Sequence, residues 1–262
     1  FVIYNPEVTF IKRLSLLNDI GVSVYILDNS PENEETQKSI VPFKNITYVT
    51  AGKNLGLGLG ISVVGATAFS SDFEMMLFLD QDTVITRETI DYINDFVMEH
   101  GSKFCTDYLL TLFQRQELNL AGNVKVRDVT LAISSGSLFY LENLRRIGWH
   151  NENYFVDLVD YEVCVRARRF GLRVGVVDAV PGFDHSLEQP DDEIVLFKKR
   201  LLIRRYSATR IQDALTAYAK LILYTVRHID FTMTKTILSS LLMYIFGQII
   251  ARLRVVKSYI RG

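Results

Sequence analysis

The first half of the chain alternates short apolar runs with segments in which apolar residues recur at helical spacing. Four apolar runs predict strands, at residues 1–4, 22–28, 46–50 and 74–80. In the first helical segment Asn5 is a candidate cap, Pro6 suits the first helical position, and Gly21 is placed to end the helix. Strands that alternate with helices in this way predict βαβ units and a parallel sheet.

The second half of the chain is less regular. Strands are predicted at residues 119–126, 130–141 and 172–178. Two glycines, Gly148 and Gly171, are placed to end predicted helices. From about residue 192 the pattern predicts an almost wholly helical segment. Residues 236–251 carry no charge, but this run of 16 is shorter than the ~20 residues that a membrane span needs.

Composition bounds the class of protein. With 262 residues, 48% of them hydrophobic and 23% charged, the chain can form one large α/β domain or one domain with an appendage. The net charge of −1 hides an asymmetry, because residues 201–262 contain ten Lys/Arg and two Asp/Glu, whereas residues 1–200 contain 19 and 28. A basic, apolar tail predicts an anionic partner, either a phospholipid surface or a diphosphate. Nucleic acid is disfavoured because no nucleic-acid motif accompanies the charge.

The two cysteines bear on the cellular compartment of the protein, and the opening residues bear on where the numbered chain starts. Cys105 and Cys164 lie in unrelated contexts without metal-ligand spacing, which predicts reduced thiols and a cytosolic protein. The opening FVIY is typical of the middle of a strand, so we expect the numbered chain to lack its true start. No signal peptide is recognised.

Polar features follow three of the predicted strands. Asp28 ends one strand, the glycine-rich stretch 52–60 follows the next, and Asp80 and Asp82 follow the fourth. Ligands of parallel sheets bind at the carboxyl ends of the strands, so we expect these features to form one site.

The two acids of the DQD stretch suit a divalent cation. Carboxylates at i and i+2 in an extended turn can face one Mg²⁺ or Mn²⁺ ion, although acids also follow strands simply because loops are solvated. DQDTV matches in addition the D-x-D-x-[TV] motif of haloacid-dehalogenase-like phosphatases, in which Asp80 would be the nucleophile and Asp82 the general acid. Three strands precede the motif and a late strand ends in a single Asp178, which weakens this alternative.

Two further segments allow a structural or a functional interpretation. The loop GKNLGLGLG opens a helix, so its N–H groups can approach phosphate or sugar, or its glycines can allow close helix–sheet packing. Asp157, Asp160 and Glu162 lie at the start of a predicted helix, where acids cap the helix or supply a general base. His185 alone is compatible with a metal ligand, a base or a surface residue.

The order of these motifs resembles inverting family 2 glycosyltransferases with the GT-A fold, and most closely their rhamnosyltransferase-like branch. The resemblance covers roughly residues 2–212. It rests on YNP (4–6), LDNS (27–30), N-x-G-L-G (54–58), LDQDT (79–83), SSGSL (134–138), FVDLVDYEVCVRA (155–167), DHS (184–186) and RRYSATR (204–210).

The resemblance implies an α/β fold with a Rossmann-like, mixed and mainly parallel sheet flanked by helices. It implies a catalytic domain at residues 1–212, with a nucleotide-sugar half at about 1–100 and an acceptor half at about 101–212. Residues 213–262 would form a basic, apolar helical extension.

The resemblance also implies roles for individual residues. Asp28 would bind the pyrimidine base, Asp80 and Asp82 the ribose and the metal, His185 would complete the metal site, and Asp160 would be the catalytic base. The remaining nucleotide-sugar contacts would be Asn54, Gly56, Ser135 and Gly136. Weaker acceptor or diphosphate contacts would be Asp157, Glu162, Arg204, Arg205 and Arg210. The chain departs from the family pattern at Gly60, Ser62, Val163, Ser207 and Ile211, which affects donor sugar and acceptor more than reaction type.

The predicted function is therefore transfer of a sugar. The first candidate is L-rhamnose from dTDP-L-rhamnose, and a UDP-sugar is the other candidate donor. The acceptor would be a glycan or lipid-linked precursor of a surface polysaccharide, in the cytoplasm or on the inner face of the plasma membrane. The basic C-terminal helices suit membrane contact or packing against protein, and homo-oligomerisation is left open. The alternatives are the phosphatase above and a non-catalytic, membrane-associated nucleotide-sugar-binding protein.

Overall fold

The computed structural model describes residues 1–31, 34–40, 42–115, 125–180, 182–183, 192–196 and 199–260. The chain forms two compact units, Phe1–Leu187 and Glu188–Gly262, and each is described by itself. The boundary that we expected after residue 212 falls inside helix α7 (Ala208–Arg227). Residues 192–203 join the second unit because strand β10 (Lys199–Ile203) packs against helix α8 (Phe231–Ile260).

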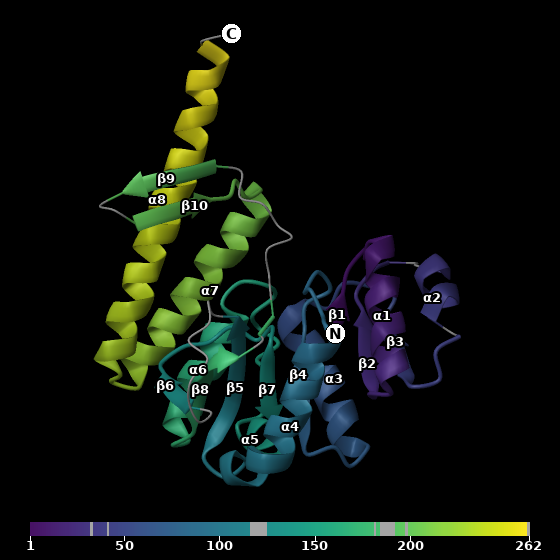
Figure 1. Ribbon diagram of the computed structural model, residues 1–262. Helices are drawn as coiled ribbons and strands as arrows, with labels where there is room; N and C mark the ends of the chain where they lie inside the picture. The colour runs from purple at the N-terminus through teal and green to yellow at the C-terminus, as the bar shows by residue number, and fades with distance from the viewer. Residues whose placement is uncertain are drawn as a thin grey trace. The chain divides into compact units, whose positions relative to one another are not determined.

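The first unit contains two sheets (Figure 1). Strands β1 (Val2–Ile3), β2 (Val24–Asp28) and β3 (Ile46–Thr50) form a parallel sheet. The second sheet has the order β4-β7-β5-β8-β6 and is antiparallel except for the parallel pair β5 and β8. Its strands are β4 (Met75–Phe78), β5 (Tyr108–Arg115), β6 (Lys125–Val129), β7 (Ser137–Tyr140) and β8 (Arg173–Val180). The predicted mixed α/β fold is confirmed, with consecutive parallel strands concentrated in the N-terminal sheet.

The helices of the first unit largely follow the sequence pattern. They are α1 (Val8–Ile20), α2 (Glu34–Ile40), α3 (Leu57–Ser70), α4 (Arg87–Phe104), α5 (Leu141–Arg146) and α6 (Val159–Arg169). Gly21, Gly148 and Gly171 follow three of them with positive φ, as expected for residues that end a helix. The predicted start of α1 was wrong, because Asn5 adopts a φ of 44° and its N–H donates to Ser30 Oγ instead of capping a helix.

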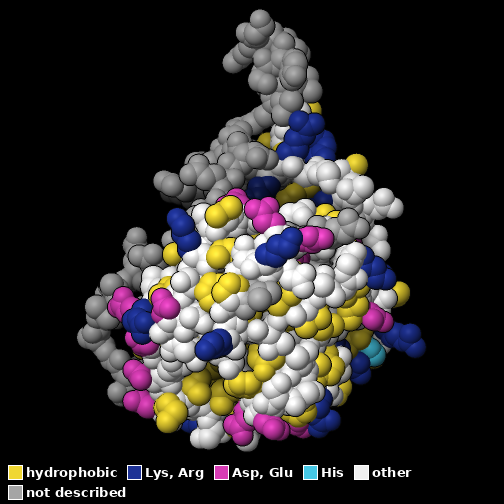
Figure 2. Space-filling view, turned by 90° about the vertical axis from the view of Figure 1, so that its right-hand side faces the viewer, with side chains coloured by type: hydrophobic (Ala, Val, Ile, Leu, Met, Phe, Trp, Pro, Cys, Tyr) yellow, Lys and Arg dark blue, Asp and Glu magenta, His cyan; other side chains and the backbone are white. Residues whose placement is uncertain are grey.

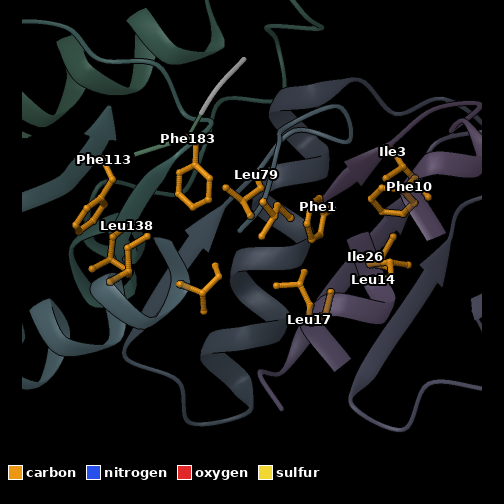
Figure 3. Packing of buried hydrophobic residues seen from close by; sticks show 14 of the residues in the cluster. Phe1, Ile3, Phe10, Leu14, Leu17, Ile26, Leu79, Phe113, Leu138 and Phe183 are labelled. Carbon is orange, nitrogen blue, oxygen red and sulfur yellow. The ribbon is translucent and has the colours of Figure 1, made fainter. Parts of the chain in front are cut away.

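One apolar core connects the N-terminal sheet with the second sheet. In Figure 3, Phe10, Leu14 and Ile26 lie at one end, Phe113 and Leu138 at the other, and the residues between them include Phe1, Leu17, Leu79 and Phe183. Helix α3 contacts both β1 and β4, so it joins the two sheets on one side. Each buried side chain of this size contributes roughly 1.5–3 kcal/mol. This core therefore fixes the strands of the two sheets relative to each other.

The second unit is a β-hairpin followed by two long helices. Strand β9 (Asp192–Leu196) pairs antiparallel with β10, from Leu196 opposite Lys199 to Asp192 opposite Ile203. The expectation of an almost wholly helical pattern from about residue 192 was wrong for this hairpin. Its Ile and Val residues favour strands, and cross-strand pairing outweighs the weak helical signal of so short a segment.

The molecular surface is mixed in charge on the face shown in Figure 2. Basic and acidic side chains are interspersed there, with hydrophobic side chains between them. This face therefore carries no extended field of a single sign, in contrast to the basic composition of residues 201–262.

Candidate functional site

Hydrogen bonds tie together the carboxyl ends of β1, β2 and β4. The N–H of Tyr4, just after β1, donates to Gln81 Oε1 over 2.8 Å, and Arg13 Nη1 donates to Gln81 O over 2.7 Å. The N–H of Asn5 donates to Ser30 Oγ, just after β2, over 2.7 Å. The sequence therefore predicted correctly that these strand ends meet, although Gln81 gave no signal beyond lying between two acids.

The DQD stretch forms a tight turn after β4. Thr83 N donates to Asp80 O over 3.1 Å, which closes a four-residue turn. Ser135 Oγ accepts the N–H of Asp80 at 2.9 Å and lies 3.0 Å from the Thr83 hydroxyl. Gly136, with a φ of 80°, donates its N–H to Phe78 O over 2.8 Å. Ser135 and Gly136, which we expected to bind the nucleotide-sugar, thus hold the acidic turn in place.

Asp160 faces the same turn from the first turn of α6. Burial, and then the charges of Asp160 and Asp82, raise the pKa of Asp80 to about 7. Burial also raises the pKa of Asp160, against the opposing effect of Ser134. Within the described part of the chain, Asp160 Oδ1 is buried without a hydrogen-bond partner. Three carboxylates separated by up to 80 positions in the sequence therefore share one electrostatic environment.

The donor set of this trio suits a hard divalent cation. Carboxylate oxygens are the ligands that Mg²⁺ and Mn²⁺ prefer, and a cation would relieve the mutual repulsion that raises the pKa of Asp80. Among the described residues, no group of three or more His, Cys, Asp or Glu side chains is arranged to hold a metal ion. His185, the expected additional ligand, lies outside the described residues. Metal binding through Asp80 and Asp82 therefore stays a prediction, with a donor chemistry that fits it.

Asp28 is fully buried at the end of β2. Its Oδ1 accepts the N–H of Ser30 at 2.8 Å, and its Oδ2 accepts the hydroxyl of Tyr48 at 2.6 Å. Burial and the bond to Asp28 raise the pKa of Tyr48. Both carboxylate oxygens thus already have protein partners, and a contact between Asp28 and a pyrimidine base stays a prediction.

Asn29, which the sequence reasoning missed, connects β2 with the glycine loop. Its Nδ2 donates to Gly56 O and its Oδ1 accepts the N–H of Leu55, each at 3.1 Å. Asn54 Oδ1 accepts the N–H of Gly56 at 2.8 Å. The motif LDNS contained the signal, because an amide next to a strand-ending acid can bind a neighbouring loop in both directions.

The start of α3 is covered by the loop at residues 151–155. Leu57 N donates to Phe155 O over 2.5 Å. A Cβ atom on Gly58 would lie 2.7 Å from the carbonyl oxygens of both Asn151 and Tyr154. These contacts support close packing as the role of Gly58, whereas phosphate or sugar contact by Asn54 and Gly56 stays a prediction.

Gly58→Ala should lower the free energy of unfolding by about 2–3 kcal/mol, because the added methyl group meets two backbone oxygens that cannot rotate away. Gly101→Ala in α4 is the matched control. Its Cβ would meet the flexible end of Met75, so we expect a change within about 1 kcal/mol. Urea unfolding of both variants measures the difference, and equal stabilities would contradict close packing at Gly58.

Glu162 braces α6 from inside the fold. It is 4% exposed, and its Oε1 and Oε2 bind Arg166 Nε and Nη2, each over 2.8 Å. Arg166 also donates to the carbonyl oxygens of Ile147 and Trp149. The carboxylate that we expected to contact acceptor or diphosphate is therefore engaged with Arg166, and the brace fixes the helix that carries Asp160.

The other expected acceptor or diphosphate contacts are dispersed. Asp157 is half-buried in the loop before α6, and Leu158, with a φ of 61°, occupies the N-cap position that was considered for Asp157. Arg204, Arg205 and Arg210 belong to the second unit, where the Arg210 guanidinium lies 4.8 Å from the centre of the Tyr206 ring. Their contacts with substrate stay predictions.

His150 packs against the Phe139 ring and provides a pH-dependent prediction. It is 4% exposed, and among the described residues neither ring nitrogen has a hydrogen-bond partner. Burial, and then the charge of Arg166, lower its pKa to about 3. Below its ordinary pKa the unfolded chain binds a proton that the folded protein excludes, so stability is lost as pH falls from about 6.5 towards 3.

Between pH 7 and pH 5, this group should remove about 2 kcal/mol from the free energy of unfolding. His150→Leu should abolish that part of the loss, because leucine does not titrate. Urea unfolding of both proteins at the two pH values measures the difference, and parallel losses in the two proteins would contradict the prediction.

A cavity in the first unit is not lined by any of the three acids. It has a volume of about 590 Å³ beside the amino-terminal ends of β2 and β4, and its lining includes Val24, Met76 and Leu138. None of the predicted site residues lines it. This cavity therefore does not mark the site, and the convergence of polar groups does.

No family model matches the chain. A curated relative, the dTDP-rhamnosyl transferase RfbF of Shigella flexneri, is 21% identical over 191 residues, which cover 67% of this chain and 64% of the relative. The chain thus spans less than two thirds of the relative's length. Among solved structures, S. aureus TarS is 19% identical with a TM-score of 0.52, covering 70% of this chain and 35% of TarS.

A second solved structure, GalNAc-T7 with UDP, GalNAc and Mn²⁺, is 9% identical with a TM-score of 0.53, over 67% of this chain and 41% of that protein. The chain has the GT-A fold. Together with the curated relative, this fold confirms the resemblance to family 2 glycosyltransferases. TarS residues 1–349 were also solved with UDP-GlcNAc, at 18% identity and a TM-score of 0.50 over 70% of this chain and 56% of that one.

Within this GT-A chain, the acidic turn after β4 lies at the carboxyl ends of the strands and faces the first turn of α6. The dehalogenase-type phosphatase gains no support, because the fold of the chain is the GT-A fold that it shares with TarS and GalNAc-T7. DxD was thus ambiguous in sequence and became informative through its place in the fold.

Proposed function

We propose that the chain is a metal-dependent, inverting glycosyltransferase that uses a nucleotide-activated sugar. The observation that carries the proposal is the buried, unpartnered Oδ1 of Asp160 in the electrostatic environment of Asp80 and Asp82. The first candidate donor is dTDP-L-rhamnose, by similarity to a relative named as a dTDP-rhamnosyl transferase. A UDP-sugar is the other candidate, since TarS and GalNAc-T7 were solved with UDP compounds.

Asp160 is the proposed catalytic base. Its carboxylate takes the proton of the acceptor hydroxyl while that oxygen attacks the anomeric carbon of the donor. The bond from the anomeric carbon to the diphosphate oxygen breaks on the opposite face, so one displacement inverts the configuration. A pKa raised by burial suits the base, because a more basic carboxylate accepts the proton more readily near neutral pH.

Asp80 and Asp82 are the proposed ribose and metal contacts. When bound, a divalent cation supplies positive charge to the departing diphosphate. Ser135 keeps the turn in one conformation through Asp80 N and the Thr83 hydroxyl, so the carboxylates need little rearrangement to receive the cation. The Glu162–Arg166 brace does the same for Asp160, by fixing α6.

The proposed acceptor is a glycan or a lipid-linked precursor in surface polysaccharide synthesis. The proposed place of action is the cytoplasm or the inner face of the plasma membrane. The basic, apolar composition of residues 201–262 supports an encounter with a lipid-linked, anionic acceptor.

A thermal-shift titration of dTDP and UDP, with and without Mn²⁺, tests the nucleotide and metal parts of this proposal. At about 100 times its Kd, a ligand stabilises the folded state by about 2.7 kcal/mol, which is a rise of several degrees in melting temperature. We expect this rise for dTDP or UDP only with Mn²⁺, and a much smaller one for dTMP and UMP, which lack the second phosphate. Trapping of aluminium fluoride at Asp80, or stabilisation that ignores Mn²⁺, would contradict the proposal.

A further inference from the structure

One side of α8 exposes large apolar residues along most of its length. Seven of them, between 38% and 67% exposed, form what we call the α8 stripe: Phe231, Leu238, Leu242, Ile245, Phe246, Ile249 and Leu253. At α-helical spacing they fall within a sector of roughly 100° and extend over about 33 Å. A continuous exposed apolar surface of this size marks an interaction site.

Helix α7 widens this surface. It lies side by side with α8 (Figure 1), and a groove of about 290 Å³ between them is lined largely by apolar residues of both helices, including Ile211, Leu215 and Ile249. At the turn between the helices, Leu223 and Ile229 are 68% and 72% exposed. The apolar surface therefore includes the end of the helical hairpin as well as its length.

The charges around this apolar surface indicate which kind of partner binds it. Residues 208–262 contain eight Lys/Arg and two Asp/Glu. Arg227 and Lys235 are exposed near the turn, whereas one of the two acids, Asp230, accepts the N–H of Met233 at the start of α8. A second copy of the chain would oppose basic side chains to basic side chains, but anionic lipid headgroups supply the missing countercharge.

We propose that the α7–α8 hairpin binds the surface of a bilayer that contains anionic phospholipid. The α8 stripe enters the boundary between headgroups and acyl chains, and Arg227 and Lys235 contact the headgroups. This proposal extends the function proposed above but does not depend on transfer activity.

The structure favours a helix that lies in the plane of the membrane. Phe231–Leu253 is long and apolar enough to cross a bilayer, with 23 residues and a mean hydropathy of 1.5, and it exceeds the uncharged run because it includes Lys235 and Arg252. However, α7 packs against α8, and Thr234 Oγ1 of α8 donates to Thr225 Oγ1 of α7 over 2.9 Å. A crossing α8 would draw Lys220 and Arg227, exposed on α7, towards hydrocarbon, which is costly.

Vesicle flotation of the 262-residue chain tests the proposal. Vesicles of phosphatidylcholine with about one third phosphatidylglycerol should bind the chain at least tenfold more tightly than pure phosphatidylcholine, and added salt should weaken the binding. The double variant Leu242→Ser/Phe246→Ser should reduce binding at least about tenfold, through loss of apolar burial. Its control, Val8→Ser/Met98→Ser, changes two residues that are 81% and 85% exposed in the first unit and should bind as wild type does.

A second pair of variants tests the charges without changing the apolar residues of the α8 stripe. Arg227→Gln/Lys235→Gln should lower binding to the anionic vesicles about tenfold or more, at about 1 kcal/mol per charge. Lys12→Gln/Arg87→Gln, which removes two exposed charges from the first unit, should leave it unchanged. Circular dichroism checks that each variant is folded.

Four outcomes would overturn the proposal. These are absence of wild-type binding, equal binding to both vesicles, equal losses in the control variants, and a solution dimer that Leu242→Ser/Phe246→Ser dissociates. Resistance of membrane-bound chain to alkaline carbonate extraction would overturn the in-plane orientation. The thermal-shift titration with nucleotides is a separate experiment from vesicle flotation. Failure of membrane binding can therefore be distinguished from failure of the proposed transfer function.

Discussion

Asp160→Asn should lower kcat at least about a hundredfold, and up to about 10⁴-fold, while the Kd for dTDP changes by less than about threefold. Asparagine keeps the size of the side chain but cannot take the proton of the acceptor hydroxyl. Because Asp160 is proposed to act in the displacement and not in holding the nucleotide, the loss should appear in kcat. Initial rates of sugar transfer and calorimetric titration of dTDP with Mn²⁺ measure the two quantities.

The matched control is Asp91→Asn, the same chemical change on an exposed position of α4. It should leave both kcat and nucleotide affinity near wild type. Near-normal transfer by Asp160→Asn with normal nucleotide binding would rule out Asp160 as the base. Loss of nucleotide binding in the same variant would show that Asp160 serves the donor site instead.

Asp80→Asn should stabilise the metal-free protein while weakening Mn²⁺-dependent nucleotide binding at least about a hundredfold. The stabilising effect follows from the pKa of about 7 for Asp80, well above the ordinary 3.8. The folded protein favours the protonated carboxyl, so this group's contribution to stability falls as pH rises from about 4 to 7 and is lowest above 7. Removing the charge should therefore raise the free energy of unfolding at pH 8 by about 2 kcal/mol, and by much less at pH 5.

Melting temperatures in EDTA at pH 5 and pH 8 measure this effect, with Asp91→Asn as the control for a generic loss of charge. Calorimetry with dTDP and Mn²⁺ measures the binding loss. A variant that is less stable than wild type at pH 8 would show that Asp80 does not repel Asp82 and Asp160. Unchanged metal-dependent binding would remove Asp80 from the proposed site.

The sequence alone determined several strands and helix ends of the first unit. Alternating apolar runs predicted β2, β3 and β4, and helix-ending glycines such as Gly21 were recognised because their positive φ leaves a strong local signal. It also predicted that the residues after β2 and β4 meet, but the parallel sheet expected to bring them together does not contain β4, which belongs to the second sheet. The link instead runs through the residues after β1, where the N–H groups of Tyr4 and Asn5 donate to Gln81 and Ser30. The strands and helix ends themselves depend on local periodicity.

Tertiary structure decided what the individual side chains do. Glu162 looked like a candidate site residue until folding placed Arg166 against it, where Arg166 also donates to the carbonyl oxygens of Ile147 and Trp149. Ser135 supports the acidic turn across 55 positions of sequence, and Gly58 fits under the loop at residues 151–155. The β9–β10 hairpin likewise depends on pairing between two segments whose individual preferences are weak.

The physical reason for this division is the range of the interactions. Periodicity, capping and turn preference act within a few residues, so they can be recognised directly in the amino-acid sequence. Burial, partner choice and pKa depend on atoms that only folding brings within a few ångströms. The sequence therefore determined that Asp80, Asp82 and Asp160 were candidates for one site, and the tertiary structure decided that their charges act on one another.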